Sequence, residues 1–171
     1  MATCDSQPIG IGRGLVLSWV LGCGTDDPKS DATTPLAFKK LGFVETRGEN
    51  ETPRTVTSNT DSSGIYTDTT VIGNDIEITA SVLDAKDVTD VSSQQELRSY
   101  FRTEVQAGRQ PSVWVRVLDP LLEEYRYYFC NVTGLGRSAE NEGNRNGEIT
   151  FTAIPTYDPT NPTYQSEAIT P

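Results

Sequence analysis

The sequence contains no histidine, and this absence excludes several kinds of enzyme. Without histidine there is no Ser-His-Asp or Cys-His nucleophile, no histidine acid–base group near neutral pH and no histidine-based zinc site. Cysteine is also scarce: the odd number and wide spacing of Cys4, Cys23 and Cys130 favour neither a disulfide framework nor a zinc knuckle. We therefore expect that the chain is not an enzyme, that it has no cofactor and no metal site, and that it is found in a reducing compartment.

Positive charge and long apolar runs are lacking too. Lys and Arg number 14 against 24 Asp and Glu, and the net charge of −10 opposes tight binding of nucleic-acid phosphates. The middle of the chain is the most acidic part, since residues 45–104 hold twelve acidic and five basic residues. The longest apolar run, residues 14–22, is far shorter than the roughly 20 residues of a membrane span. These features predict a soluble, unexported chain without membrane contact.

The length of 171 residues suits one domain with its own buried core. Residues 1–13 are rich in glycine, and residues 155–171 contain four prolines and no periodic apolar pattern. Such stretches are typical of chain ends that lie outside a core. We therefore predict a single domain over residues 1–171, with a β core and helix at 14–154 between an N-terminal arm and a C-terminal arm.

Most apolar residues between these ends recur at every second position, which predicts strands with one buried face. The clearest segment is 75–82, where Ile76 and Ile78 share one face and Asp75 and Glu77 share the other. The remaining predicted strands are 14–21, 41–46, 112–118, 125–132 and 147–154.

One segment has helical spacing instead, because its apolar residues fall at i, i+3, i+4 and i+8 and form a single stripe. Either Ser92 with Gln95 or Ser93 with Glu96 can form a capping box, and Gly108 can supply the positive φ that ends a helix. We predict a helix at about 93–107 that packs on the sheet, which makes the fold class mainly β (α+β). The predicted helix–sheet core consists of Leu97, Tyr100, Phe101, Val105, Ile76 and Ile78.

Residues 47–70 have no sustained period and are rich in Thr, Ser, Asn and Asp, which predicts a long loop or a loose hairpin. Connections longer than about 12–15 residues in a compact domain are usually functional or disordered. The segment is therefore expected to make a contact outside the monomer.

Acidic residues recur on the polar sides of two predicted strands, at Asp75 and Glu77 and again at Glu148. Such faces are either ordinary solvent faces or parts of an acidic wall that DNA passes without adhering. The residues alone leave both interpretations open. The aromatic run at 125–129 is more typical of a core or a subunit contact than of base stacking, because no basic groove accompanies it.

The order of these parts resembles the major tail tube proteins of long, noncontractile-tailed bacteriophages, over residues 36–155. The segments that carry the resemblance are Gly73-Asn-Asp-Ile-Glu-Ile-Thr-Ala, Gln94-Gln-Glu-Leu-Arg-Ser-Tyr-Phe, Pro111-Ser-Val-Trp-Val-Arg-Val, Tyr127-Tyr-Phe-Cys-Asn-Val-Thr-Gly-Leu-Gly and Gly147-Glu-Ile-Thr-Phe-Thr-Ala. The resemblance implies a β-sandwich protomer, hexameric rings whose sheets join into one barrel around a DNA channel, and rings that stack into a tube.

The resemblance also implies roles for particular residues. Asp75, Glu77 and Glu148 become candidate channel-lining residues. The candidate ring-stacking residues, from the segment 47–70, are Glu49, Glu51, Arg54, Asp61, Tyr66 and Asp68. The implied partners are further copies of the chain and other tail proteins (tape measure, tail tip and terminator), in a virion tail assembled in the host cytoplasm, with DNA passing unbound. Two alternatives stay open: a type VI secretion-like ring or tube protein, and a solitary carbohydrate- or receptor-binding β-sandwich.

Overall fold

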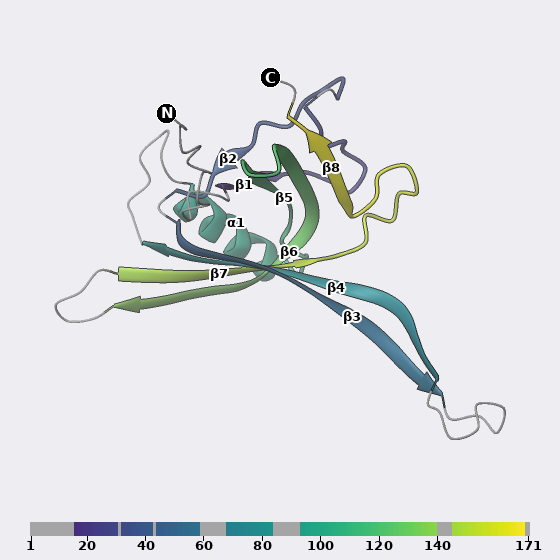
Figure 1. The fold of residues 1–171 in the computed structure, drawn as a ribbon. Helices are drawn as coiled ribbons and strands as arrows, with labels where there is room; N and C mark the ends of the chain where they lie inside the picture. Colours follow the sequence, from purple (N-terminus) through teal and green to yellow (C-terminus); the bar gives the residue numbers. More distant parts are fainter. Residues whose placement is uncertain are drawn as a thin grey trace, which may run out of the picture.

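The computed structural model describes residues 16–30, 32–42, 44–58, 68–83, 93–139 and 145–169, which form one antiparallel sheet and one helix (Figure 1). The strands are β1 (Val16–Leu21), β2 (Lys39–Lys40), β3 (Val44–Ser58), β4 (Asp68–Leu83), β5 (Ser112–Asp119), β6 (Glu124–Ala139), β7 (Arg145–Ala153) and β8 (Tyr164–Ala168); the helix is α1 (Gln94–Gln106). The order in the sheet is β2-β1-β5-β6-β7-β4-β3, and β8 also pairs with β6. This confirms the mainly β fold with one helix. The helix is too short and too polar to cross a membrane.

Strand β6 belongs to two layers and joins them. Its first half, from Glu124 to Asn131, pairs with β5, whereas its second half, from Cys130 to Ala139, pairs with β7. The register skips Thr133, a bulge that bends a strand and increases its twist. The sheet therefore folds over at β6 into an upper layer, β2-β1-β5-β6-β8, and a lower layer, β6-β7-β4-β3 (Figure 1).

Strands β7 and β8 follow the same edge of β6 one after the other. β7 pairs with β6 as far as Ala153 opposite Cys130, and β8 resumes at Tyr164 opposite Tyr128. Residues 154–163 leave the sheet between them, and both ends of this excursion bond to the backbone of Phe129. Most of the stretch expected to be a C-terminal arm is therefore tied to the domain, because β6 offers it a free edge. The predicted N-terminal arm at 1–13 lies outside the described residues.

The core lies between the two layers. The alternation predicted for 75–82 places Ile78, Ala80 and Val82 at 1% exposure or less, facing buried residues of the upper layer. Trp19, Val115 and Phe151 are equally buried. The aromatic run of β6 fills both faces of its strand, since Tyr128 belongs to this core while Tyr127 and Phe129 belong to a second cluster on the outer side of the upper layer.

Helix α1 closes one side of the sandwich. Leu97 is fully buried, and Tyr100, Phe101 and Ile76 pack partly buried against the core. Val105 lies outside the core at 52% exposure, because the eighth position after Leu97 falls about 80° away from it around the helix. The Gly108 stop has the expected positive φ of 71°.

Of the two capping boxes predicted at the start of α1, the one between Ser93 and Glu96 does not form, and the other depends on Ser92, which lies outside the described residues. Ser93 is the N-cap residue, but its hydroxyl accepts from Trp19 Nε1 at 2.6 Å and donates to the carbonyl of Lys40 at 2.9 Å. Glu96 instead pairs with Lys39. Tertiary partners have replaced the local cap, and they tie the helix to β1 and β2.

Of the two predictions for 47–70, the hairpin is the one observed. Strands β3 and β4 pair from Val44 opposite Val82 to Ser58 opposite Asp68, so only residues 59–67 lie between the strands, and they are not described. β4 pairs with β7 only up to Glu77. Beyond that point the hairpin is a two-stranded ribbon, residues 51–58 and 68–76, which projects from the rest of the domain (Figure 1). We call this ribbon the hairpin extension and the other described residues the body.

Candidate assembly surfaces

One face of the lower layer is polar across all its strands. Directly opposed residues of antiparallel strands share a face, and the registers place Thr46, Asn50, Thr52, Asp75, Glu77, Thr79, Ser81, Asn146, Glu148, Thr150 and Thr152 together. We call this set the polar face. It lies opposite the face that carries Ile78 and Phe151 into the core. The structure thus brings together the three candidate channel-lining residues from β4 and β7.

The acidic groups of the polar face are not equivalent. Glu77 and Glu148 are exposed, and no described residue forms an ion pair with either. Asp75 is also exposed, but its Oδ1 lies 3.0 Å from Nε of Arg54 across the hairpin. An exposed ion pair of this kind contributes about 0–1 kcal/mol. Its effect here is to neutralise Asp75 locally, so the unpaired negative charge of the face is carried by Glu77 and Glu148.

Glycines reduce the side-chain volume on and beside the polar face. A Cβ atom at Gly48 would lie 2.7 Å from Oγ1 of Thr79, and one at Gly134 would lie 3.1 Å from the side chain of Thr150. Gly136 is one of the residues that line an open hollow of about 510 Å³ on this face, together with threonine and serine side chains and the charged Arg137 and Glu148. The surface therefore offers small hydroxyl groups and few charges, which suits contact with water more than tight binding of a ligand.

The candidate stacking residues divide into three groups. Glu51 and Arg54 lie on the hairpin extension and bond across it, Glu51 accepting from Nδ2 of Asn74 at 2.9 Å. Asp68 begins β4, with its backbone opposite Ser58. Asp61 and Tyr66 lie outside the described residues.

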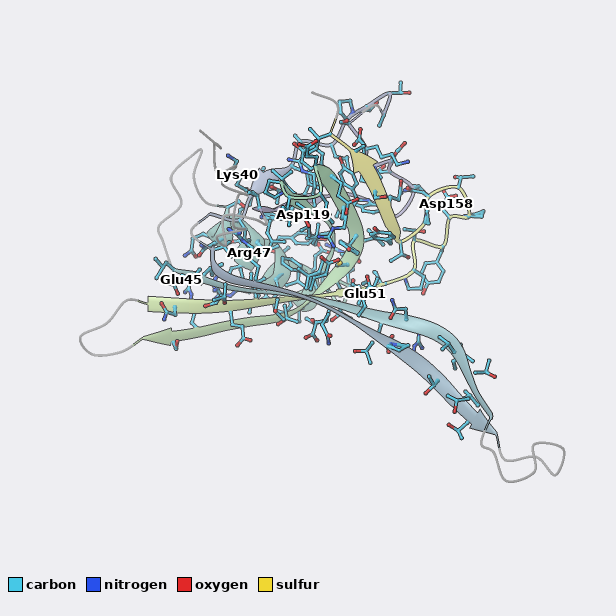
Figure 2. The ribbon with its side chains drawn as sticks, in the orientation of Figure 1. Lys40, Glu45, Arg47, Glu51, Asp119 and Asp158 are labelled. Carbon is cyan, nitrogen blue, oxygen red and sulfur yellow. The ribbon has the colours of Figure 1, made fainter. Side chains whose placement is uncertain are left out.

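Glu49 is placed differently from its prediction as a stacking residue. Its side chain is only 13% exposed and points from β3 into the body, where Oε2 lies 2.8 Å from Nη1 of Arg126. It also accepts a hydrogen bond from the hydroxyl of Tyr128. In Figure 2, Glu51, two residues further along β3, lies near the point where the extension leaves the body. The charge pattern of the segment could not reveal this difference, because the partners of Glu49 are more than 75 residues away in sequence.

The extension also carries apolar residues that the charge pattern did not single out. Val56, Val71 and Ile72 are 50%, 63% and 62% exposed. The register skips Ile72, so this residue forms a bulge in β4 and the ribbon bends near its outer end (Figure 1). The sequence held one signal: two adjacent apolar residues interrupt the alternation of β4. Exposed apolar side chains on a projecting ribbon are typical of a contact surface. Val71 is opposite Thr55 and Val56 is opposite Thr70, so these two valines lie on opposite faces of the ribbon.

The lower layer has two free edges. Among the described residues, β3 forms strand pairs only with β4, and residues 133–139 of β6 form strand pairs only with β7, where Arg98 of α1 also donates to the carbonyls of Leu135 and Gly136. Arg47 lies on the β3 edge, and its Nε is buried without a hydrogen-bond partner among the described residues. Burial lowers the pKa of this guanidinium. Unpaired strand edges recruit further strands unless they are covered.

The described residues contain no group of three or more His, Cys, Asp or Glu side chains arranged to hold a metal ion. The second aromatic cluster is covered in part by a side chain of the same molecule. Arg116 stacks between the rings of Phe38 and Tyr125, at 4.6 and 4.8 Å from their centroids.

The fold is similar to solved structures of tail assemblies. The tail of an empty gene transfer agent particle, refined with C6 symmetry, matches with a TM-score of 0.59 and 14% identity over 84% of this chain and 92% of that chain. The SPP1 tail tube matches with a TM-score of 0.55 and 12% identity over 92% of this chain and 80% of that chain. The baseplate of the anti-feeding prophage matches with a TM-score of 0.53 and 6% identity over the full length of both chains.

No protein-family profile matches the sequence, and no curated protein matches it. Identities this low establish a shared fold. The predicted likeness to tail tube proteins of noncontractile tails is confirmed at that level.

Proposed function

We propose that this chain, which has the fold of phage tail tube proteins, is a structural subunit of such a tube rather than an enzyme. In this proposal six copies form a ring, rings stack into a tube, and DNA passes through the channel into the host. The assembly would be part of a virion tail put together in the host cytoplasm, where the tape measure, tail tip and terminator proteins are its further partners. The C6 symmetry of the gene transfer agent tail supports a sixfold ring for a chain of the same fold.

The observation that carries the proposal is the pair of free edges on the lower layer. The strands β6, β7, β4 and β3 alternate in direction, so the outer two, β6 and β3, run in opposite directions. A copy rotated about an axis parallel to the strands brings its β6 edge beside the β3 edge of its neighbour in antiparallel orientation. Repetition of this step closes the sheet into a barrel and removes both edges, which is the most complete protection that an edge can have.

Arg47 supports a copy-to-copy contact at the β3 edge. Buried polar groups are usually hydrogen-bonded, and Nε of Arg47 has no partner among the described residues, so a group of another copy can bond to it. A carboxylate or carbonyl from the neighbouring β6 would complete its hydrogen bonds. In this geometry the polar face lines the inside of the barrel, because the opposite face is already covered by the upper layer and α1.

The chemistry of the polar face suits a DNA channel. Glu77 and Glu148 are repeated in every copy, so the wall is negative and repels phosphate groups, while small hydroxyl side chains keep it smooth and hydrated. DNA would then move through without specific binding. The hairpin extension supplies the contact between rings, since its apolar Val56, Val71 and Ile72 are at least half exposed in the part of the chain that the structure describes.

The decisive experiment compares the chain with a variant in which residues 53–74 are replaced by Asn-Gly. Thr52 and Asp75 are directly opposed, so a two-residue turn can join them and leave the body intact. Electron microscopy of the concentrated chain, with light-scattering mass, is expected to show hollow tubes or stacked sixfold rings. The variant is expected to give folded monomers or single rings. Tubes formed by the variant would contradict the role of the extension, and an intact chain without rings or tubes at any concentration, even with a tail-tip template, would contradict the proposal.

The channel face is tested by the double substitution Glu77→Lys and Glu148→Lys. Rings should still form, because both residues are exposed, but assembled tubes should now retain duplex DNA and release it as salt rises. Fluorescence anisotropy of a labelled duplex measures this. Asp27→Lys with Glu123→Lys is a matched control with the same change in charge at exposed positions outside the polar face and the extension. Equal DNA binding by both variants would remove Glu77 and Glu148 from the channel.

The likeness to the anti-feeding prophage baseplate supports a second candidate, a ring or tube of an injection or secretion apparatus. The same electron micrographs separate the two. Rings that remain single at high concentration favour the secretion-type assembly, whereas continuous tubes favour the phage-type tail.

A further inference from the structure

The hairpin extension receives little support along its length. Every described side chain from Glu51 to Thr57 is exposed, and so are those of Thr69 to Ile72 on the opposite strand. A two-stranded ribbon is only marginally stable by itself in water. The direction in which the extension projects is therefore set where it joins the body.

Glu49 lies two residues before the start of the extension at Glu51 and contacts the upper layer there, close to Ile76, which is opposite Glu51 and packs against the core. Its partners Arg126 and Tyr128 belong to the first half of β6, which lies three strands away from β3 in the order of the sheet. The contact is therefore not part of the β ladder. It crosses from the lower layer to the upper layer and joins them at the base of the extension.

The partners of Glu49 are themselves held in place. Arg126 is 18% exposed and is also bonded to Asp119 at 3.0 Å and close to Glu124 at 3.4 Å. Burial alone would lower the pKa of Arg126, but the surrounding charges, Glu49 first, raise it overall. The ring of Tyr128 packs against that of Tyr164 in β8, with centroids 5.2 Å apart.

Tyr128 is a permanent donor in this arrangement. Burial, followed by its bond to Glu49, raises the pKa of the Tyr128 hydroxyl far above the ordinary value, so it stays protonated at all physiological pH. One carboxylate is thus bound at both oxygens by two anchored groups, which fixes its orientation as well as its position.

We propose that Glu49 is a positioning residue: by clamping β3 to Arg126 and Tyr128 it sets the direction of the hairpin extension before the chain meets another copy. Its consequence for assembly rests on the tube function proposed above. A segment already held in its binding direction loses less conformational entropy on docking. Glu49 therefore favours stacking without touching the neighbouring ring.

The clamp can be tested in the unassembled chain by distance measurement between two spin labels. Labels at Thr55 in the extension and Ser166 in β8 are both on exposed positions. They are introduced as cysteines in a chain whose Cys4 and Cys23 are replaced by serine, while the buried Cys130 is left in place. Dilution with excess unlabelled chain keeps labelled neighbours apart.

The intact chain is expected to give one narrow distance distribution. Glu49→Ala should broaden it at least about twofold, because the preorganised direction is lost, and Tyr128→Phe should broaden it less, since Arg126 remains. Glu51→Ala is the matched control: Glu51 points from the same side of β3 but bonds only to Asn74 within the hairpin, so its removal should leave the distribution unchanged.

A broad distribution in the intact chain, or equal widths for Glu49→Ala and Glu51→Ala, would overturn the proposal. Arg126 keeps two other carboxylates in these variants, so the body should stay folded, which circular dichroism checks. Glu49→Gln retains an acceptor for Tyr128, so the width of its distance distribution should fall between that of the intact chain and that of Glu49→Ala. Tube formation is then measured separately. If the clamp is present but no variant or parent assembles, the tube function fails and the positioning role of Glu49 stands.

Discussion

Ile78 and Ile72 lie on the same strand of the hairpin but differ in solvent exposure. Ile78 is 1% exposed under the upper layer, whereas Ile72 is 62% exposed on the extension. The residue type and the strand are the same, and the difference is whether a second layer covers the position. Body and extension therefore use apolar side chains for different purposes: those of the body stabilise the fold, and those of the extension are available to another chain.

The largest expected effect is the loss of a core side chain in the body. Phe151 is 1% exposed between the layers, so Phe151→Ala should lower the free energy of unfolding by about 3–5 kcal/mol. Urea unfolding followed by circular dichroism measures it. Ile72→Ala in the extension is the control and should change the value by less than about 0.5 kcal/mol. Similar losses of unfolding free energy at both positions would contradict the proposed difference between body and extension.

A smaller loss is expected at a buried hydrogen bond of the body. Tyr127 is fully buried, and its hydroxyl donates to Oε2 of Glu167 at 2.8 Å. Tyr127→Phe should cost about 1 kcal/mol in the same unfolding experiment, since Glu167 keeps the bonds from Ser30. A variant as stable as the parent would show that this contact does not help to hold β8 and the 22–38 segment against the rest of the body.

The pH dependence of the body should contain a smaller contribution from Glu167. Burial would raise the pKa of this carboxyl, but hydrogen bonds from Ser30 and Tyr127 outweigh it and hold the pKa below 4.5 in the folded chain. A lowered folded-state pKa stabilises the fold above the unfolded-state value, and the contribution disappears as pH falls through the folded-state value. Glu167→Gln should therefore reduce stability by at most about 1 kcal/mol at pH 7 and leave it unchanged in strong acid. Equal losses at pH 7 and in strong acid would exclude this linkage.

The smallest effect on stability is expected in the extension. Joint replacement of Val56, Val71 and Ile72 by serine should leave unfolding within about 0.5 kcal/mol of the parent, because all three are at least half exposed. The same variant should lose tube formation in electron micrographs, if these residues form the contact between rings. Normal tubes from the triple variant would place that contact elsewhere.

Period and spacing predicted much of the body. The alternation at 75–82 and the helical stripe after Ser93 placed β4 and α1 correctly, because these patterns record which side of an element faces the core. The apolar pattern did not predict the structure where contact with a neighbouring strand or layer determines it. Residues 51–58 have no apolar period because neither side of the hairpin extension is covered, and residues 164–168 form a strand only because β6 has a free edge there.

The sequence by itself determined the alternation of β4 and β7, the helix and the acidic character of the polar face, since each depends on residue type and local spacing. Only the tertiary structure decided that Asp75 is paired with Arg54, that the lower layer ends in two free edges, and that Glu49 is turned inward to Arg126 and Tyr128. The physical reason is distance along the chain: these contacts join residues from separate strands, and their partners are chosen by the fold-over of the sheet at β6.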